Sequence, residues 1–230
     1  MKHHCTTARF GTAVIGILMC LAGGAQAQVP YAHLQRPTDS SANGPTSWFV
    51  TTYEQAGASN IGWTTCGYDA TSEGCYGSGQ LGPFVRPCAV AGSGGRVFVL
   101  DSLGPGSSSV LYVYQQVESS TPSVTLLKTL PLSPLGLTST GSCSLAVLGA
   151  WVYAGHSQSL AYARVHLTDN SVQGGSICGG PTTAITASDK AVVVSMSNCF
   201  QVFDKQGNSF GDGGQFSNTF VPGSNGHQLP

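Results

Sequence analysis

The chain has 230 residues, a formal net charge of −1 and only 8% charged side chains, against about 25% in an average soluble protein. It lacks the basic footprint of a nucleic-acid-binding protein or of a polybasic membrane patch. Uncharged polar residues must supply most of its surface, a composition more typical of exported β-rich proteins than of intracellular helical ones.

Residues 1–27 have the layout of a secretory signal peptide. Lys2 and Arg9 give a positive start, an apolar run extends from Phe10 to Leu21, and Ala25-Gln26-Ala27 is a small-x-small cleavage pattern. We therefore expect this segment to be removed and the rest of the chain to be exported to the periplasm or the extracellular space. The apolar run is too short to span a bilayer and no second run follows, so we expect no membrane span.

The mature sequence keeps six cysteines, and an even number in an oxidising compartment favours disulfides over metal ligands. They are Cys66, Cys75, Cys88, Cys143, Cys178 and Cys199. Six cysteines allow fifteen pairings, which composition leaves open. No C-x2-C pair, a usual spacing in zinc sites, occurs among them. A Cys66–Cys75 bridge would close a loop of about ten residues and stabilise the fold by roughly 2.5–3 kcal/mol.

Residues 28–46 are polar and rich in proline and small residues, and we expect an extended arm there. Within 47–86, Ser47–Tyr53 is rich in aromatic and β-branched residues and predicts a strand. Gly57–Phe84 carries many glycines and little regular periodicity, which indicates a long surface loop stapled by its two cysteines. Loops of this kind often carry binding surfaces, so ligand contact is the alternative to a purely structural loop.

Residues 87–216 contain a repeated pattern of short β-type runs. Three units begin at equivalent positions, Cys88, Cys143 and Thr183, and nine residues later each reaches the core of a second run. These second runs are Val97-Phe98-Val99, Val152-Tyr153-Ala154 and Val192-Val193-Val194. A turn separates the two runs in every unit. Third runs follow at Val110–Tyr114, Leu160–Val165 and Phe200–Phe203, and fourth runs at Val124–Leu130 and Ser171–Ile177.

The spacing of the units predicts the architecture. Successive units are offset by 55 and then 40 residues, and the longer first unit carries a Gly/Ser-rich turn and a proline-containing tail. Four short antiparallel strands in about 40 residues are the pattern of a β-propeller blade. We therefore predict an all-β fold of propeller-like repeats, as a small or an incomplete ring, with a β-sandwich as the alternative. Residues 217–230 are expected to form a flexible tail.

Val202-Phe203-Asp204-Lys205-Gln206-Gly207-Asn208 is a strand followed by an aspartate and a Gly-Asn turn. With the repeated units, it makes the region from Pro87 to Phe216 resemble bacterial secreted β-propellers of the NHL-type, YWTD-type and gluconolactonase-like kinds. The resemblance is generic and includes no full set of family motifs, so no functional residues are carried over from it. It implies that a divalent cation is the cofactor to consider, because gluconolactonase-like propellers hold one at the channel mouth.

Candidate ligands for such a cation are acidic and amide side chains, which suit a hard metal. They are Glu54, Asp101, Asn198 and Asp204. They form no compact motif, and aspartate and asparagine also stabilise turns through local hydrogen bonds. The sequence therefore favours a protein without a cofactor, with these four residues as weak candidates.

The order of strands in a blade predicts which of the remaining polar residues lie on the same face. The connection before the first strand and the one between the second and third strands lie on the same face. Seven residues fall near that rim: Cys88, Cys143, Cys178, Asp101, His156, Asn198 and Cys199. This placement favours a Cys178–Cys199 bridge, and Cys88–Cys143 would follow by elimination.

Four side chains outside the expected core are candidate ligand contacts. They are Trp63, Tyr68, Tyr76 and His156. We predict an exported, non-enzymatic binding or scaffold module whose partner is a protein or a carbohydrate, and not a nucleic acid. The alternative is a metal-dependent, lactonase-like hydrolase. A cluster of Asp101, Asn198 and further carboxylates around a central channel would favour the enzyme.

Overall fold

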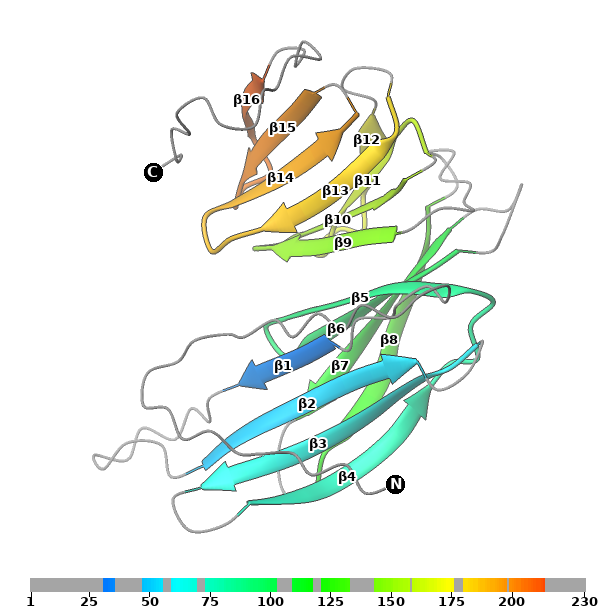
Figure 1. The fold of residues 1–230 in the computed structure, drawn as a ribbon, viewed down its shortest axis with the longest axis vertical. Helices are drawn as coiled ribbons and strands as arrows, with labels where there is room; N and C mark the ends of the chain where they lie inside the picture. The colour runs from blue at the N-terminus through cyan, green and yellow to red at the C-terminus, as the bar shows by residue number, and fades with distance from the viewer. Residues whose placement is uncertain are drawn as a thin grey trace, which may run out of the picture.

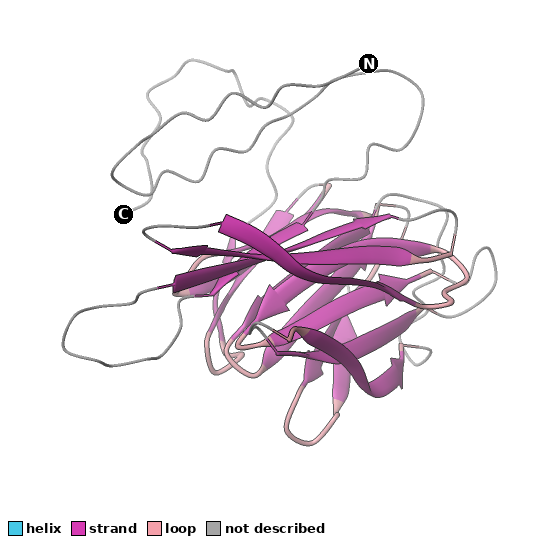
Figure 2. Ribbon diagram, turned by 90° about the horizontal axis from the view of Figure 1, so that it is seen from below, coloured by secondary structure: helices cyan, strands magenta, loops and turns pink. Residues whose placement is uncertain are grey.

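A computed structural model describes residues 31–35, 47–55, 59–69, 73–102, 109–117, 121–132, 143–157, 159–175, 180–197 and 199–213. The regular secondary structure in these ranges is β-strand throughout (Figure 2), which confirms the predicted all-β class. No helix in the ranges has the length and apolarity needed to cross a membrane. The predicted signal peptide and the predicted tail, 217–230, lie outside the described residues.

In the described ranges, sixteen strands form four antiparallel sheets of four strands each, always in chain order. The first sheet contains β1 (Tyr31–Gln35), β2 (Ser47–Gln55), β3 (Ile61–Asp69) and β4 (Glu73–Leu81). The second contains β5 (Pro87–Ser93), β6 (Arg96–Asp101), β7 (Val110–Val117) and β8 (Ser123–Pro131). The third contains β9 (Cys143–Leu148), β10 (Trp151–His156), β11 (Tyr162–His166) and β12 (Val172–Gly175). The fourth contains β13 (Thr182–Ala187), β14 (Ala191–Met196), β15 (Cys199–Asp204) and β16 (Ser209–Gly213).

Consecutive sheets meet through their first strands (Figure 1). β1 contacts β5, β5 contacts β9, and β9 contacts β13. The other strands of each sheet follow outward in chain order. Blades of a propeller are arranged in this way, with first strands inside and fourth strands outside. The fold is therefore propeller-like, with four blade-like sheets.

Buried apolar clusters fill the spaces between consecutive sheets, because each sheet must bury its apolar face against a neighbour. The first and second sheets share Tyr53, Ile61, Trp63, Leu81, Phe84, Val97, Val99 and Tyr114. The second and third share Phe98, Leu100, Leu111, Val113, Leu132, Val152, Ala154, Ala163 and Val165. The third and fourth share Ala146, Leu148, Trp151, Tyr153, Tyr162, Ile185, Val192, Val194 and Phe203. Among the described residues, no buried apolar cluster joins the fourth sheet to the first.

The repeat alignment is confirmed by the register of the second strands. Val97, Val152 and Val192 are each the second residue of β6, β10 and β14. Each is buried, and each packs into the cluster shared with the preceding sheet. The three sequence units therefore place equivalent residues at equivalent points of successive sheets.

The first sheet differs from the sequence-based expectation. The segment predicted as a long loop contains two strands of nine residues each, β3 and β4. Cys66 and Cys75 are direct neighbours on these strands, and their disulfide joins the sheet rather than closing a surface loop. Glycine obscures the alternation in the sequence. At Gly79, for example, a Cβ would lie 2.7 Å from Nε1 of Trp63, so the missing side chain lets the indole ring lie across β4.

Candidate functional site

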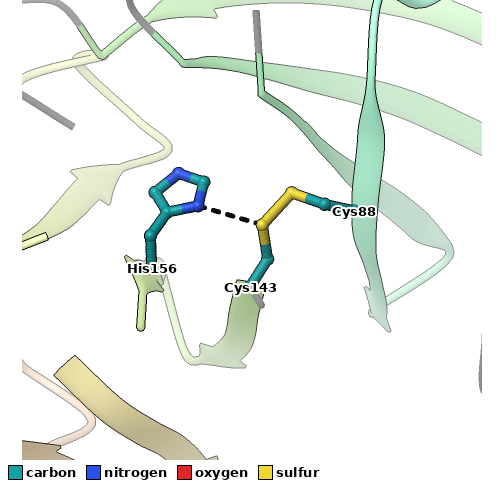
Figure 3. A group of neighbouring side chains, drawn as sticks. All are labelled: Cys88, Cys143 and His156. Carbon is teal, nitrogen blue, oxygen red and sulfur yellow. Dashed lines mark hydrogen bonds between the residues drawn. A yellow bond between two sulfur atoms is a disulfide. The ribbon is translucent and has the colours of Figure 1, made fainter. Parts of the chain in front are cut away.

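Two cysteines and a histidine form a cluster where the second and third sheets meet (Figure 3). Cys88, on β5, forms a disulfide with Cys143 at the start of β9, which confirms one predicted pair. His156 ends β10, and the register of the β9–β10 hairpin places it opposite Cys143. The structure thus brings together three residues that strand order placed near one rim.

The ring of His156 is held at both nitrogens. Its Nδ1 lies 3.0 Å from Cys143 Sγ, its Nε2 lies 2.8 Å from Ser109 Oγ, and the side chain is fully buried. A disulfide sulfur carries no proton, so Nδ1–H donates to Sγ and Nε2 accepts from the Ser109 hydroxyl. Burial, followed by the positive charge of Arg86, lowers the pKa of His156 from 6.5 to about 4. The imidazole is therefore neutral at neutral pH.

The other cysteines among the described residues also form disulfides. Cys66 and Cys75 are bonded to each other, as predicted. Cys199, which begins β15, is disulfide-bonded as well. Cys178, its predicted partner, lies outside the described residues. The described cysteines thus serve the structure as cross-links.

Two of the carboxylates proposed as metal ligands, Asp101 and Asp204, accept hydrogen bonds from the backbone. Asp101 is buried, and its Oδ2 and Oδ1 accept hydrogen bonds from the N–H groups of Val85 at 2.9 Å and Arg86 at 2.6 Å. These bonds hold the segment that leads into β5. Asp101 ends the second strand of its sheet and Asp204 ends the third, so antiparallel pairing sends them to opposite ends of the strands.

Asp204 stabilises the turn that follows β15. Its Oδ1 accepts from the N–H groups of Gln206 at 2.9 Å and Asn208 at 2.8 Å, and its Oδ2 accepts from Asn208 Nδ2 at 3.0 Å. These hydrogen bonds to the carboxylate lower the pKa of Asp204 against the opposing effect of burial, which is the largest single influence. Asn198 lies outside the described residues. The structure therefore does not assemble Asp101 and Asp204 into a common site.

The candidate ligand contacts have different surroundings. Trp63 is only 9% exposed and belongs to the cluster between the first two sheets, and His156 is buried in the disulfide cluster. Tyr76 is 46% exposed, and its ring lies 6.3 Å from that of Phe49. The side chain of Tyr68 lies outside the described residues. Of the described three, only Tyr76 is largely exposed.

A polar groove of about 770 Å³ lies along the first sheet. The register of β2, β3 and β4 builds it from two rows of side chains. One row is Thr52, Thr64 and Ser78, and the next is Glu54, Gly62 and Gln80. Because residues two apart in a strand share a face, both rows project from the same side of the sheet. We call the lining of this space the first-sheet groove: Thr52, Glu54, Gly62, Trp63, Thr64, Ser78, Gly79 and Gln80.

Exposed hydrogen-bonding side chains line much of the first-sheet groove. Glu54, Thr64, Ser78 and Gln80 are all exposed. Gly62 lies between Glu54 and Gln80 in its row. Because glycine has no side chain, the surface of the sheet is recessed between these two longer side chains. Asn60 donates to Gln80 Oε1 at 3.4 Å at one end of the row. The groove can therefore offer several hydroxyls, an amide and a carboxylate to one ligand.

No family model matches the chain, and no curated protein sequence does. Solved structures share some similarity with it. A proposed 6-phosphogluconolactonase from Bacteroides fragilis is 12% identical, with a TM-score of 0.43 over 80% of this chain and 53% of that one. Hsv2 of Kluyveromyces lactis is 9% identical, with a TM-score of 0.40 over 74% of this chain and 58% of that one. The chain thus spans a little over half the length of these proteins.

Several residues of the two sites are absent from the sequence-based candidates. Ser109 was hidden because only the fold brings the start of β7 to the end of β10. Thr52, Thr64 and Ser78 are ordinary strand residues, and only their pairing across three strands makes them a row. The polar alternation from Gly62 to Thr64 and from Ser78 to Gln80 was the available signal.

Proposed function

We propose that this protein is an exported, non-enzymatic binding module that takes a carbohydrate in the first-sheet groove. The observation that carries the proposal is the pair of polar rows on three hydrogen-bonded strands. Side chains on strands are held more precisely than side chains on loops. A sugar presents hydroxyls that both donate and accept, and the groove offers matching hydroxyl, amide and carboxylate groups.

The charge of the groove supports a neutral ligand. Among the described residues that line it, none is basic, and Glu54 is the single acid. A phosphate or a nucleic acid would meet a carboxylate with no counter-charge. A protein partner would gain most from a central aromatic or arginine anchor, and the exposed members of the groove supply none. Adjacent sugar hydroxyls, in contrast, can both donate to one carboxylate.

The metal-dependent hydrolase predicted as the alternative has less support. A hard divalent cation needs several oxygen ligands, and Glu54 is the single acid among the described lining residues. Asp101 and Asp204 accept backbone hydrogen bonds elsewhere. Export is supported by the disulfides, which persist in oxidising compartments.

Binding of the purified protein to an array of neutral and acidic oligosaccharides tests the proposal, followed by calorimetry on the best neutral sugar. We expect Glu54→Gln to weaken that affinity about 10- to 100-fold, because hydrogen bonds to a charged group contribute about 1.5–3 kcal/mol. Thr64→Val keeps the shape of the side chain and removes one hydroxyl, so we expect a loss of roughly 2- to 10-fold.

Asp189→Asn is the matched control. Asp189 is an exposed acid in the turn between β13 and β14, far along the chain from the groove, and its substitution should leave the affinity unchanged. The proposal is contradicted if the folded protein retains no neutral sugar. It is contradicted equally if Glu54→Gln and Thr64→Val bind the sugar as tightly as the parent protein.

A further inference from the structure

The cluster at the junction of the second and third sheets has the composition of a metal site. Cys88, Cys143 and His156 each offer one ligand atom, and these three atoms lie within 4.8 Å of one another. We propose that, after reduction of the Cys88–Cys143 disulfide, the two thiolates and His156 Nδ1 bind one Zn²⁺ ion. The site is separate from the first-sheet groove and does not depend on carbohydrate binding.

The chemistry of the ligands selects the metal. Thiolate and imidazole ligands suit zinc, whereas magnesium and calcium prefer oxygen. Two cysteines and one histidine fill three positions of a tetrahedral zinc ion, and water can fill the fourth. The Cα atoms of the cysteines are 5.6 Å apart. Rotation about the Cα–Cβ bonds can therefore separate the sulfurs to the roughly 3.8 Å that two Zn–S bonds of about 2.3 Å require.

Formation of the site requires a reductant, which we specify as a dithiol. The dithiol transfers two electrons to the disulfide, whose S–S bond breaks to give two cysteine thiols while the dithiol closes to a cyclic disulfide. Binding of Zn²⁺ then releases the two thiol protons. Cys88 and Cys143 are only half-buried, so a small dithiol can reach them.

His156 is already oriented for this role. Its Nδ1 faces Cys143 Sγ at 3.0 Å, and Ser109 Oγ lies 2.8 Å from its Nε2. In the disulfide form Nδ1 carries the ring proton. In the zinc form the proton moves to Nε2, which donates to Ser109 Oγ and leaves the Nδ1 lone pair for the metal. Histidine ligands are commonly fixed by such a hydrogen bond at the second nitrogen.

Titration with Zn²⁺ alone tests the proposal, on protein reduced with a dithiol and freed of it under nitrogen. We expect the reduced protein to take up one Zn²⁺ and the oxidised protein none. With Co²⁺ as a spectroscopic probe, thiolate-to-metal absorption should appear only after reduction. We expect His156→Gln to weaken zinc binding by at least tenfold, and Ser109→Ala by about tenfold.

Paired serine variants separate this site from the other thiols. Cys66→Ser/Cys75→Ser removes a disulfide on the first sheet and should still bind one Zn²⁺ when reduced. Cys88→Ser/Cys143→Ser should bind none. Zinc uptake by the latter, or no uptake by reduced protein that keeps its β-sheet circular dichroism, overturns the proposal. Loss of that spectrum on reduction overturns it too, because no preformed site would then exist.

Discussion

The side-chain amide of Gln116, on β7, donates to Thr51 Oγ1, on β2, at 3.1 Å and so joins the first two sheets by a buried hydrogen bond. The amide oxygen of Gln116 accepts from the Tyr53 hydroxyl. The hydroxyls of Thr51 and Thr65 are bonded to each other at 2.7 Å. A polar network therefore crosses the interface beside its apolar cluster.

We expect Gln116→Leu to lower the free energy of unfolding by about 1–3 kcal/mol, because it removes partners of the buried Tyr53 and Thr51 hydroxyls. Urea denaturation followed by tryptophan fluorescence measures the loss. Gln206→Leu is the control, because that side chain is exposed in the turn after β15. Equal midpoints for the two variants would contradict a stabilising role for the network.

Removal of the two disulfides should lower the free energy of unfolding by different amounts. Cys66 and Cys75 are 9 residues apart, and Cys88 and Cys143 are 55 apart. On the chain-entropy model the longer loop gives the larger stabilisation, about 4 kcal/mol against about 2.7 kcal/mol. We therefore expect the Cys88→Ser/Cys143→Ser variant to unfold at lower urea than Cys66→Ser/Cys75→Ser. The reverse order would show that strand pairing, rather than loop closure, determines the cost.

Alanine substitutions at three glycines distinguish the cost of a positive φ from the cost of a steric clash at the added Cβ. Gly207 has a φ of 81°, and a Cβ there would lie 2.5 Å from the Trp151 ring, whereas Gly94 has a φ of 58° in open space. We expect Gly94→Ala to cost about 1–2 kcal/mol and Gly207→Ala to cost more. Gly175→Ala, with open space and no positive φ, should change stability by less than about 0.5 kcal/mol. Thermal unfolding of the three variants gives the order.

Stability should fall as the pH falls from about 6.5 to 4. The folded protein holds the pKa of His156 at about 4, below the roughly 6.5 of an unfolded histidine, so the unfolded state binds more protons in this window. The contribution lost by pH 4 is about 3 kcal/mol. Urea denaturation at several pH values should show a shallower dependence for His156→Gln than for the parent protein. Parallel curves would contradict the assignment.

Apart from β16, the strands of the last three sheets were predictable, because apolar residues alternate along them or form short runs such as Val97–Leu100. Strand order alone also predicted that Cys143 and His156 share a rim. The first sheet was not predictable in the same way. Its strands β3 and β4 carry Thr, Ser and Gly on one face, and Gly67 and Gly79 lie against the rings of Tyr76 and Trp63, so their sequence is typical of a loop.

The roles of individual polar residues depend on contacts that only the folded structure creates. Asp101 is the residue type of a metal ligand, and nothing in its sequence neighbourhood shows that its oxygens accept the N–H groups of Val85 and Arg86. Ser109 lies 47 residues from His156, so their contact arises only when β7 and β10 are brought to one junction. The periodicity of apolar residues predicts single strands, but it does not predict which side chains of different sheets will be in contact.

The Cys88–Cys143 bond also determines how the molecule would carry a pulling force. A tension applied to the two ends of the chain would pass from β5 to β9 through the sulfurs, which join residues 55 positions apart. The strands β6, β7 and β8 lie between those residues and would bear none of the load. About 190 Å of extended chain would stay out of reach until the bond is reduced, so the redox state of this disulfide would set the extensibility of the segment from Cys88 to Cys143.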